Sequence, residues 1–421
     1  MTTFNDFVTK GKDFYRHHRL LINLGVLFVN MILCCFCDWA SYIALVILPL
    51  MVIFEKNYGG IYYLLFTLPF LNVAKIYDIG YAVPLAAIIY VLFNFIKAFF
   101  VEKGKLNKIA LIFIILLEIY LALPINPYSA MTFIKMAVFL LGYMFLEIMR
   151  EKGKALRFKT IIYTFLVGLL LSSVCALFMP YSEIMQGASV DFDYKGYSRF
   201  CGLLLYPSFY SLFCTIALCM LLYLVFNDKY KLFNLFLSLL VTFCGFMTMS
   251  KAFILLFCVV LFFAVIKMFT LNPKKALLIC GIILVVFSLI YVCFTDFVTA
   301  IIQRFSSSTH FEDFKEFNWS EILTFRNDIW GEYLTLIFAD PHIIFFGAGL
   351  GAGGMNPHNT YIGVWYQAGL IGFIFIFFTL AYMVFQIYKT VAEEQGRLDW
   401  FIVVPVLVVA MDMFAEGFLF L

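Results

Sequence analysis

The sequence predicts an all-α polytopic membrane protein with about 12–13 transmembrane helices. Of the 421 residues, 64% are hydrophobic and 13% are charged, and the mean hydropathy is +0.98. Apolar stretches of membrane-spanning length recur between short polar connections along nearly the whole chain. A soluble domain of this length could not bury so much apolar surface in one core, so lipid is expected to surround most of the chain.

The apolar stretches are predicted to be helices, because strands would leave backbone groups unpaired in lipid. Most approach the length of about 20 residues that a helix needs to cross a bilayer, and residues 61–74 are the shortest. Together they form one transmembrane domain over residues 1–421. The predicted spans are residues 20–37, 39–54, 61–74, 79–101, 109–125, 131–149, 160–180, 207–226, 232–249, 252–268, 276–294, 360–388 and 400–420.

A basic N-terminus, "MTTFNDFVTKGKDFYRHHR", precedes the first span and lacks a small-residue cleavage site. We therefore expect an uncleaved signal anchor with a cytoplasmic N-terminus. If the spans alternate from there, basic connections such as "EKGKLNK" and "REKGKALRFK" lie in the cytoplasm with most of the 29 Lys and Arg residues. This is the distribution that the positive-inside rule requires. The net charge of +3 reflects this topology and predicts no nucleic-acid partner.

Two long connections, residues 180–206 and 295–357, are predicted on the outer face. Loops longer than about 15 residues are usually functional or disordered, and the aromatic, patterned second loop favours function. Within it, residues 297–305 are expected to form a short amphipathic helix. A longer helix is expected from the candidate N-cap Asn318 to Pro341.

Three outer-face cations are candidates for binding an anionic group. Arg199 lies just before a span, and Lys251 occupies a very tight turn between two spans, where a charge is costly without a partner. Arg326 and Trp330 share one face of the expected loop helix, with Tyr333 beside them. Such cations suit a diphosphate and can replace a metal ion in stabilising a departing pyrophosphate. The alternative is that they are solvated loop charges or snorkelling side chains.

The stretch "NPHNTYIGVWYQAGLIG", residues 356–372, places His358 in a Pro-His-Asn turn directly before a span. A neutral imidazole, with an ordinary pKa of about 6.5, can take a proton from an attacking hydroxyl at neutral pH. The alternative is that His358 only caps the helix that follows. The sequence has no Cys/His cluster with metal-ligand spacing, so no metal site is predicted.

Four motifs, taken in order, resemble the O-antigen polymerase/O-antigen ligase superfamily. "SRFCGLLLYP" resembles its Arg-x-x-Gly element before a helix, and "MSKA" resembles its Ser-Arg-Gly turn. "FRNDIW" followed by "ADPHIIFFGAGLG" resembles its Arg-x-x-x-Trp, Pro and Gly-x-Gly stretch. "PHNTYIGVWYQAGLIG" resembles its His-Asn signature. The resemblance covers about residues 195–385, and all four motifs fall on the same predicted membrane face.

The resemblance implies an inverting, metal-independent glycosyltransferase of the C-type membrane fold, without a cofactor. Such an enzyme takes an undecaprenyl-diphosphate-linked glycan from the surrounding membrane lipid, at the outer face of the bacterial inner membrane. The implied site residues are His358 as the base that acts on the acceptor hydroxyl, Arg199, Lys251 and Arg326 as ligands of the diphosphate, and Asn359, Trp330 and Tyr333 in support.

Four positions depart from the family pattern. Lys251 stands where the family usually has Arg, and Ala252 stands where it has Gly. Ser208 and Gln367 occupy positions that often hold Asn and Glu. The last difference argues against any acid–base role for Gln367.

The acceptor distinguishes two reactions within the family. A polymerase joins lipid-linked oligosaccharide repeat units into a surface polysaccharide of the O-antigen or capsule type, alone or beside a chain-length regulator. An O-antigen ligase instead transfers the glycan to the lipid A core. The polymerase is favoured because Phe/Ile/Lys-rich usage hints at an AT-rich genome, and because polymerases diverge more widely from the shared pattern.

A transporter or flippase for a lipid-linked glycan is the alternative from another class. Transporters place ionisable groups near the bilayer midplane and often contain inverted repeats. Asp412 and Glu416 are four apart in a predicted span and so share a helix face. No internal repeat is apparent, however, and the cations described above lie outside the spans, so an enzyme is favoured.

Overall fold

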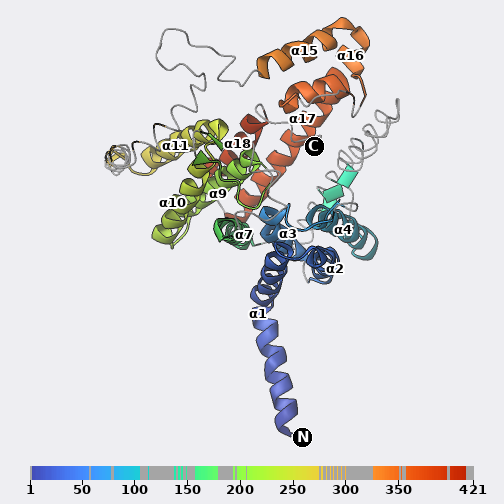
Figure 1. The fold of residues 1–421 in the computed structure, drawn as a ribbon, viewed down its shortest axis with the longest axis vertical. Coiled ribbons are helices and arrows are strands. Elements are labelled where there is room, and N and C mark those ends of the chain that lie inside the picture. Colours follow the sequence, from blue (N-terminus) through green and yellow to red (C-terminus); the bar gives the residue numbers. More distant parts are fainter. Residues whose placement is uncertain are drawn as a thin grey trace.

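The structure is a computed structural model, and helices make up most of what it describes (Figure 1). Two hairpins of two-residue strands are also present: β1 (Lys75–Ile76) pairs antiparallel with β2 (Gly80–Tyr81), and β3 (Asp193–Tyr194) with β4 (Tyr197–Ser198). The described residues are 2–55, 58–76, 80–104, 157–178, 193–194, 197–204, 206–274, 326–349, 357–395 and 399–413, with isolated positions between them.

Five of the described helices are long and apolar enough to cross a membrane, which confirms the predicted class of all-α membrane protein. They are α4 (Ala82–Ile96) continued by the π-helical turn η3 (Lys97–Val101), α7 (Phe158–Phe178), α9 (Pro207–Asn227), α11 (Lys251–Leu271) and the first 27 residues of α17 (Thr360–Gln395). The other described helices are α1 (Thr2–Cys34), α2 (Asp38–Phe54), α3 (Gly60–Thr67) with the 3₁₀ turn η2 (Leu68–Phe70), α10 (Lys231–Met247), α15 (Arg326–Ala339), α16 (Pro341–Phe346), and the 3₁₀ turn η5 (Trp400–Val403) with α18 (Val404–Asp412).

The predicted limits of α2, α7, α9, α10 and α11 agree closely with the observed ones. Three predicted spans, 109–125, 131–149 and 276–294, lie mostly outside the described residues. The amphipathic helix expected at 297–305 also lies outside them, apart from residue 299. So does Asn318, the predicted N-cap of the longer loop helix. The helix count and the single domain therefore stay predictions.

Residues 61–74 do not form the one continuous helix that was predicted. Pro69 has no amide hydrogen to donate, and at this point α3 gives way to η2 and then to a non-helical end. The segment still runs antiparallel to α2. At one end, a Cβ on Gly60 would lie 2.5 Å from a carbonyl oxygen of α2. At the other, Ser41 Oγ donates to the Val73 carbonyl at 3.4 Å.

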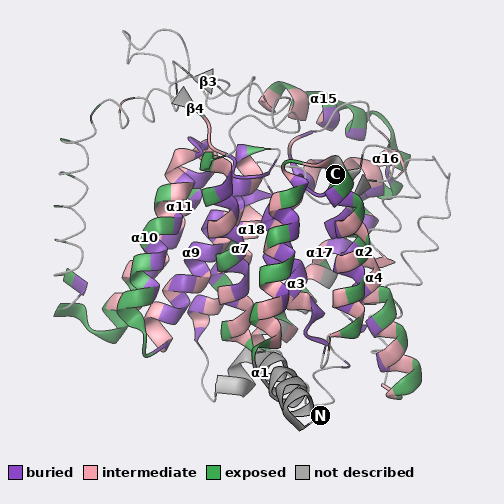
Figure 2. Cartoon of the chain, turned by 60° about the horizontal axis from the view of Figure 1, so that its bottom comes forward, coloured by how far each residue is buried: buried purple, intermediate pink, exposed green. Residues whose placement is uncertain are grey.

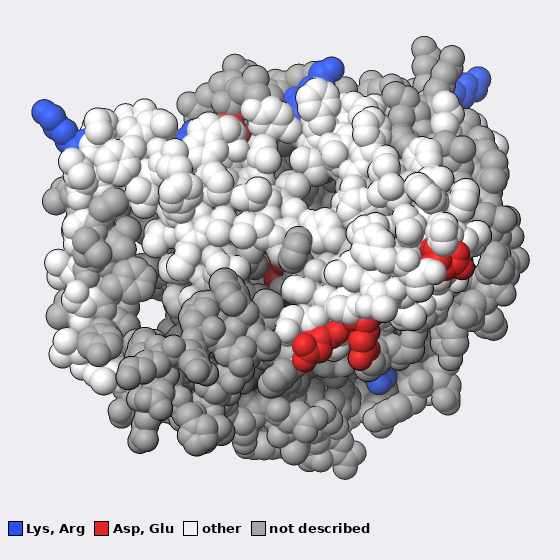
Figure 3. Space-filling view, turned by 90° about the horizontal axis from the view of Figure 1, so that it is seen from above, with Lys and Arg blue, Asp and Glu red and all other residues white. Residues whose placement is uncertain are grey.

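The outward face of α10 shows why this chain needs lipid. Five large apolar side chains, spaced three or four residues apart in most cases, are each more than half exposed: Leu232, Phe233, Phe236, Leu239 and Phe243. Exposed residues recur on the outer sides of the helices in Figure 2, and the face seen in Figure 3 has broad areas without charged residues. Soluble proteins rarely expose apolar patches of this extent, so contact with lipid accounts for them.

Helix α9 is the centre of one set of helices, packed against α7, α10, α11 and α18. Its buried residues include Tyr210, Cys214 and Cys219, each with no exposed surface. A second set consists of α1 to α4, and α7 packs against α3 of that set. A Cβ on Gly168 would lie 2.2 Å from the Phe66 carbonyl oxygen, so this close approach of α7 to α3 requires glycine.

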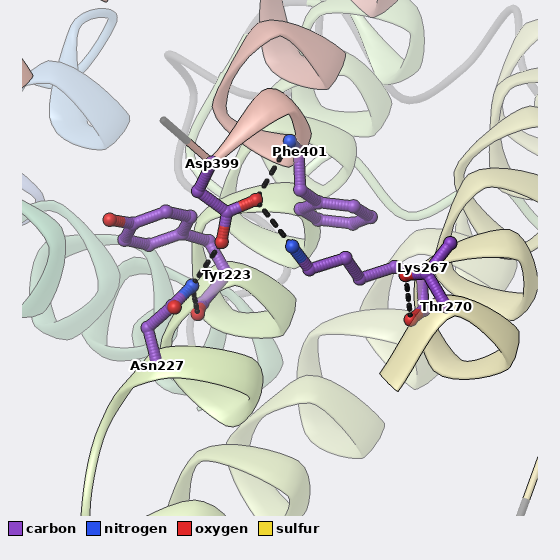
Figure 4. A network of polar contacts seen from close by, with 6 residues as sticks. All are labelled: Tyr223, Asn227, Lys267, Thr270, Asp399 and Phe401. Carbon is purple, nitrogen blue, oxygen red and sulfur yellow. Dashed lines mark hydrogen bonds and ion pairs between the residues drawn. The ribbon is translucent and has the colours of Figure 1, made fainter. Parts of the chain in front are cut away.

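A buried carboxylate joins three helices at the end of the bundle where α9 and α11 finish (Figure 4). The Asp399 side chain, 5% exposed, accepts a hydrogen bond from Lys267 Nζ at 2.8 Å. Asn227 Nδ2 and the Phe401 N–H also donate to it, at 2.7 Å and 3.0 Å. Burial alone would raise the pKa of Asp399, but these hydrogen bonds and the charge of Lys267 lower it below its ordinary value.

This network predicts acid sensitivity. A carboxyl group with a lowered pKa contributes stability above the pKa of the unfolded chain, about 3.9, and loses that contribution as the pH falls through the folded pKa. We expect thermal unfolding in detergent to be level between about pH 8 and pH 5 and to shift to lower temperature below about pH 4. Asp399→Asn should be less stable at pH 7 by roughly 3 kcal/mol, because it leaves the Lys267 charge buried without a counter-charge.

The same unfolding measurements across pH distinguish the contribution of Asp399 from that of the other carboxylates. Asp399→Asn should also show a smaller acid-induced loss than the unmodified protein, since one of the titrating groups is gone. If the variant unfolds at the same temperature as the unmodified protein at pH 7 and has the same acid profile, the network does not stabilise the fold.

Candidate functional site

All the predicted site residues fall at one end of the bundle. Figures 1 and 2 show α15 and α16 opposite the N-terminus. We call this the α15 end. Helices α9, α11 and α17 begin at this end, and the site residues form two groups on it.

The first group contains Arg199 and Lys251. Arg199 Nε donates to the Thr248 carbonyl at 3.1 Å, and the Phe200 N–H donates to the Met247 carbonyl at 3.0 Å. Thr248 is fully buried and belongs to the tight turn that Lys251 follows as the first residue of α11. Arg199, which is half-buried, is therefore held against the same turn that carries Lys251.

Local sequence features shape this group. Gly202 has a φ of +59°, and a Cβ there would lie 2.6 Å from the Tyr210 ring, so only glycine allows the chain to turn from Arg199 into α9. Pro207 then occupies the first turn of α9, where its missing N–H costs nothing. In the next connection, Ser250 caps α11 by accepting a hydrogen bond from the Phe253 N–H at 3.4 Å.

Cys201, beside Arg199, is buried. Burial raises the pKa of its thiol to about 11, although the charge of Arg199 opposes the shift. The thiol therefore stays protonated at neutral pH, and a thiolate nucleophile is not part of this site.

The second group surrounds the start of α17. Asn359, only 1% exposed, caps the helix through Oδ1, which accepts from the Ile362 N–H at 3.1 Å. The Thr360 N–H donates to the Met413 carbonyl at 2.8 Å, which joins the start of α17 to the end of α18. The capping role considered for His358 therefore belongs to Asn359.

His358 itself has an unusual backbone. Its φ is +48°, in the left-handed region that residues other than glycine rarely adopt. Met249, two residues before Lys251, has the same φ of +48°. Such conformations persist only where the surroundings enforce them, and they are frequent at functional sites. Each group at the α15 end thus contains one strained position beside or at a predicted site residue.

Helix α15 contacts the His358 turn directly. Trp330 Nε1 donates to the Pro357 carbonyl at 2.9 Å. Tyr333, 6% exposed, packs edge-on against Tyr366 of α17, with ring centroids 5.0 Å apart. The predicted face of α15 is thus the one that meets α17, and Arg326, half-buried, begins the helix. The helix ends before Pro341 as predicted, but Pro341 then starts α16.

A break in α17 fixes α16 beneath α15. Gly369 is not helical, with φ +64° and ψ −179°, so the Tyr366 and Gln367 carbonyls lose their helical partners. They accept instead from the Ala348 and Gly349 N–H groups, at 2.8 Å and 3.1 Å. A Cβ on Gly369 would lie 2.3 Å from the Phe345 carbonyl oxygen, and one on Gly347 would lie 2.3 Å from the Gln367 carbonyl oxygen. These contacts explain why the "QAGLIG" and "GAGLG" stretches need glycine here.

Helix α18 packs against α9 and α11 and ends one residue before Met413, whose carbonyl accepts the hydrogen bond from Thr360 at the start of α17. Asp412, which the transporter alternative would use, is 2% exposed and lies one residue before Met413 at that junction. Thr248 was missed altogether, because a carbonyl that binds a side chain 49 residues away leaves no local pattern.

Chemically, the α15 end offers two cations held on one turn and an imidazole on a strained turn. Cations so arranged can bind a phosphate, and an imidazole can accept a proton. No known family, characterised protein or solved structure matches the chain. The geometry at this end is therefore the basis for assigning a function.

The break in α17 gives a stability prediction. Gly369→Ala should destabilise the protein by roughly 2 kcal/mol or more, because alanine is strained at positive φ and its methyl group would collide with the backbone of α16. Thermal unfolding in detergent measures the change. The matched control is Gly331→Ala, where a Cβ would meet nothing within 4 Å.

The control should be neutral or stabilising by up to about 1 kcal/mol, since alanine favours the helical conformation of α15 more than glycine does. Equal unfolding temperatures for Gly369→Ala and the unmodified protein would mean that the break does not hold α16 against α17.

Proposed function

We propose that the protein is a polymerase that joins undecaprenyl-diphosphate-linked oligosaccharide repeat units into a surface polysaccharide of the O-antigen or capsule type. The observation that carries the proposal is the hydrogen bond from Arg199 Nε to the Thr248 carbonyl, since it brings Arg199 to the turn that carries Lys251. Two cations from separate connections are thereby presented at one end of the bundle, as a diphosphate ligand requires.

The proposed reaction is the one that the family resemblance implies. The acceptor hydroxyl gives its proton to His358, and its oxygen forms a bond to the anomeric carbon of the donor sugar. The bond from that carbon to the diphosphate breaks at the same time, with inversion of configuration. Arg199, Lys251 and Arg326 stabilise the negative charge that develops on the departing undecaprenyl diphosphate, and no metal ion is needed for that step.

The supporting residues would set the position of the base. Asn359 fixes the start of α17, and Trp330 ties the Pro357 carbonyl to α15. Tyr333 keeps α15 on α17. These contacts hold the His358 backbone on both sides, which favours a fixed imidazole over a freely rotating loop side chain.

The membrane supplies the donor. Apolar side chains such as Phe236 and Phe243 face outward from α10, so a polyprenyl tail can remain in lipid while its headgroup reaches the α15 end. In the proposed setting this end is on the outer face of the bacterial inner membrane and the N-terminus is cytoplasmic. The proposed fold is the C-type glycosyltransferase fold, and a chain-length regulator is a candidate partner.

Two other functions share part of this support. An O-antigen ligase would use the same donor groups and differ in its acceptor, the lipid A core. The break in α17 is the one observation in support of a transporter, since discontinuous helices line the substrate sites of many transporters. Here, however, the Tyr366 and Gln367 carbonyls beside the break already accept hydrogen bonds from Ala348 and Gly349, which argues for a structural break.

An in vitro assay tests the reaction. Purified protein, a lipid-diphosphate-linked repeat unit and EDTA should give a ladder of products on a gel. His358→Ala should lower the rate by a factor of about 100 or more, because general base catalysis contributes roughly 10²–10⁴-fold. A single shifted band that needs added lipid A core would identify a ligase instead.

The matched control is His342→Ala, an exposed histidine of α16 at the same end of the bundle. It should polymerise like the unmodified protein, with both variants unfolding at similar temperatures. A normal ladder from a folded His358→Ala protein would contradict the proposed base.

A further inference from the structure

A cavity of about 640 Å³ lies at the end of the bundle opposite α15, between the start of α7 and the end of α9. Its volume is within the range of small-ligand sites, roughly 300–1,000 Å³. The lining residues are Arg157, Phe158, Lys159, Thr160, Tyr223, Leu224 and Asn227. None of them belongs to the proposed glycan site.

Basic side chains form one part of the lining. The exposed Arg157 is positioned through its backbone, whose N–H donates to Tyr62 Oη at 3.1 Å. Lys159 Nζ binds the buried Asp228 carboxylate at 2.7 Å, while the Lys159 side chain stays 58% exposed. The hydrogen bond from Lys159 holds the pKa of Asp228 below its ordinary value, so that carboxylate is charged at neutral pH. Asp228 offsets one of the two cations, and an excess of positive charge remains.

Apolar side chains form the other part. Phe158 packs edge-on against Tyr223, with ring centroids 5.6 Å apart, and Leu224 is 1% exposed. Both α7 and α9 are of membrane-spanning length, and α7 begins and α9 ends at this level, so the cavity lies where lipid headgroups meet the hydrocarbon. A ligand that fits must therefore combine an anionic head with an apolar body.

We propose that this cavity binds the phosphate headgroup of an anionic membrane lipid. Arg157 and Lys159, whose side chain is 58% exposed, would donate to the phosphate oxygens, while the half-buried Phe158 would contact the glycerol and upper acyl chains. Basic pockets between transmembrane helices are a known form of headgroup site. A lipid bound there would also brace Asn227, whose Nδ2 donates to Asp399 in the network of Figure 4.

Native mass spectrometry of the full-length protein tests the site. The protein is exchanged into micelles that contain equal amounts of phosphatidylglycerol and phosphatidylethanolamine, and the bound lipids are weighed. The unmodified protein should retain phosphatidylglycerol in preference to the zwitterionic lipid. Arg157→Gln should reduce phosphatidylglycerol retention by roughly tenfold, because it removes a charge-assisted contact to the phosphate.

Two further variants make the result specific. Lys274→Gln changes the charge equally at an exposed position just beyond α11, outside the cavity lining, and should retain the lipid like the unmodified protein. Thr160→Trp fills the cavity without changing the charge, and should release the lipid as Arg157→Gln does. Unfolding temperatures are recorded for each variant so that lost binding is not mistaken for lost fold.

The outcomes separate the possible sources of phosphate. The proposal would be overturned if the unmodified protein retained the two lipids equally. It would also be overturned if Arg157→Gln retained as much phosphatidylglycerol as the unmodified protein. Binding of inorganic phosphate alone, with no preference for phosphatidylglycerol, would assign the cavity to a soluble phosphate and overturn the lipid assignment. The lipid site does not depend on the proposed polymerase, and loss of activity in a His358 variant leaves it untouched.

Discussion

The hydrogen bonds from the Ala348 and Gly349 N–H groups to the Tyr366 and Gln367 carbonyls are the contacts on which the α15 end depends. A helix in lipid cannot leave backbone groups unpaired, so a break such as the one at Gly369 is stable only where the protein supplies new partners. The chain after α16 supplies them. In doing so it fixes α16 against α17, and with it the position of α15 over the His358 turn.

Two separate connections converge on this end, and each is held there by contacts with neighbouring elements. Arg199 is held by the Thr248 carbonyl at the turn between α10 and α11, while the turn that carries His358 contacts α15 through Pro357 and the end of α18 through Thr360. Helix α18 packs against α9 and α11, and Met413 just beyond it binds the start of α17. At the opposite end, the buried Asp399 and its partners join α9 and α11 to the start of η5.

The helices were predictable where local signals are strong. Pro207 and Ser250 mark the starts of α9 and α11, and apolar runs set their lengths. The sequence placed Arg199 and Lys251 on the same predicted membrane face, but it gave no sign that they meet at one turn. The break at Gly369 was hidden in a continuous apolar run, because its cause is a contact with α16 rather than a local pattern. The Asn227–Asp399 bond, 172 residues apart in the chain, was likewise out of reach.

The most direct test of a donor site at the α15 end is an electron cryo-microscopy structure of the protein in a lipid nanodisc with the lipid-diphosphate-linked repeat unit and no metal ion. We predict density for the diphosphate with its oxygens within about 3.5 Å of the Arg199 and Lys251 side-chain nitrogens, and the first sugar directed toward His358. Diphosphate density at any other surface, with the Thr248–Lys251 turn in contact only with lipid or solvent, would contradict the assignment.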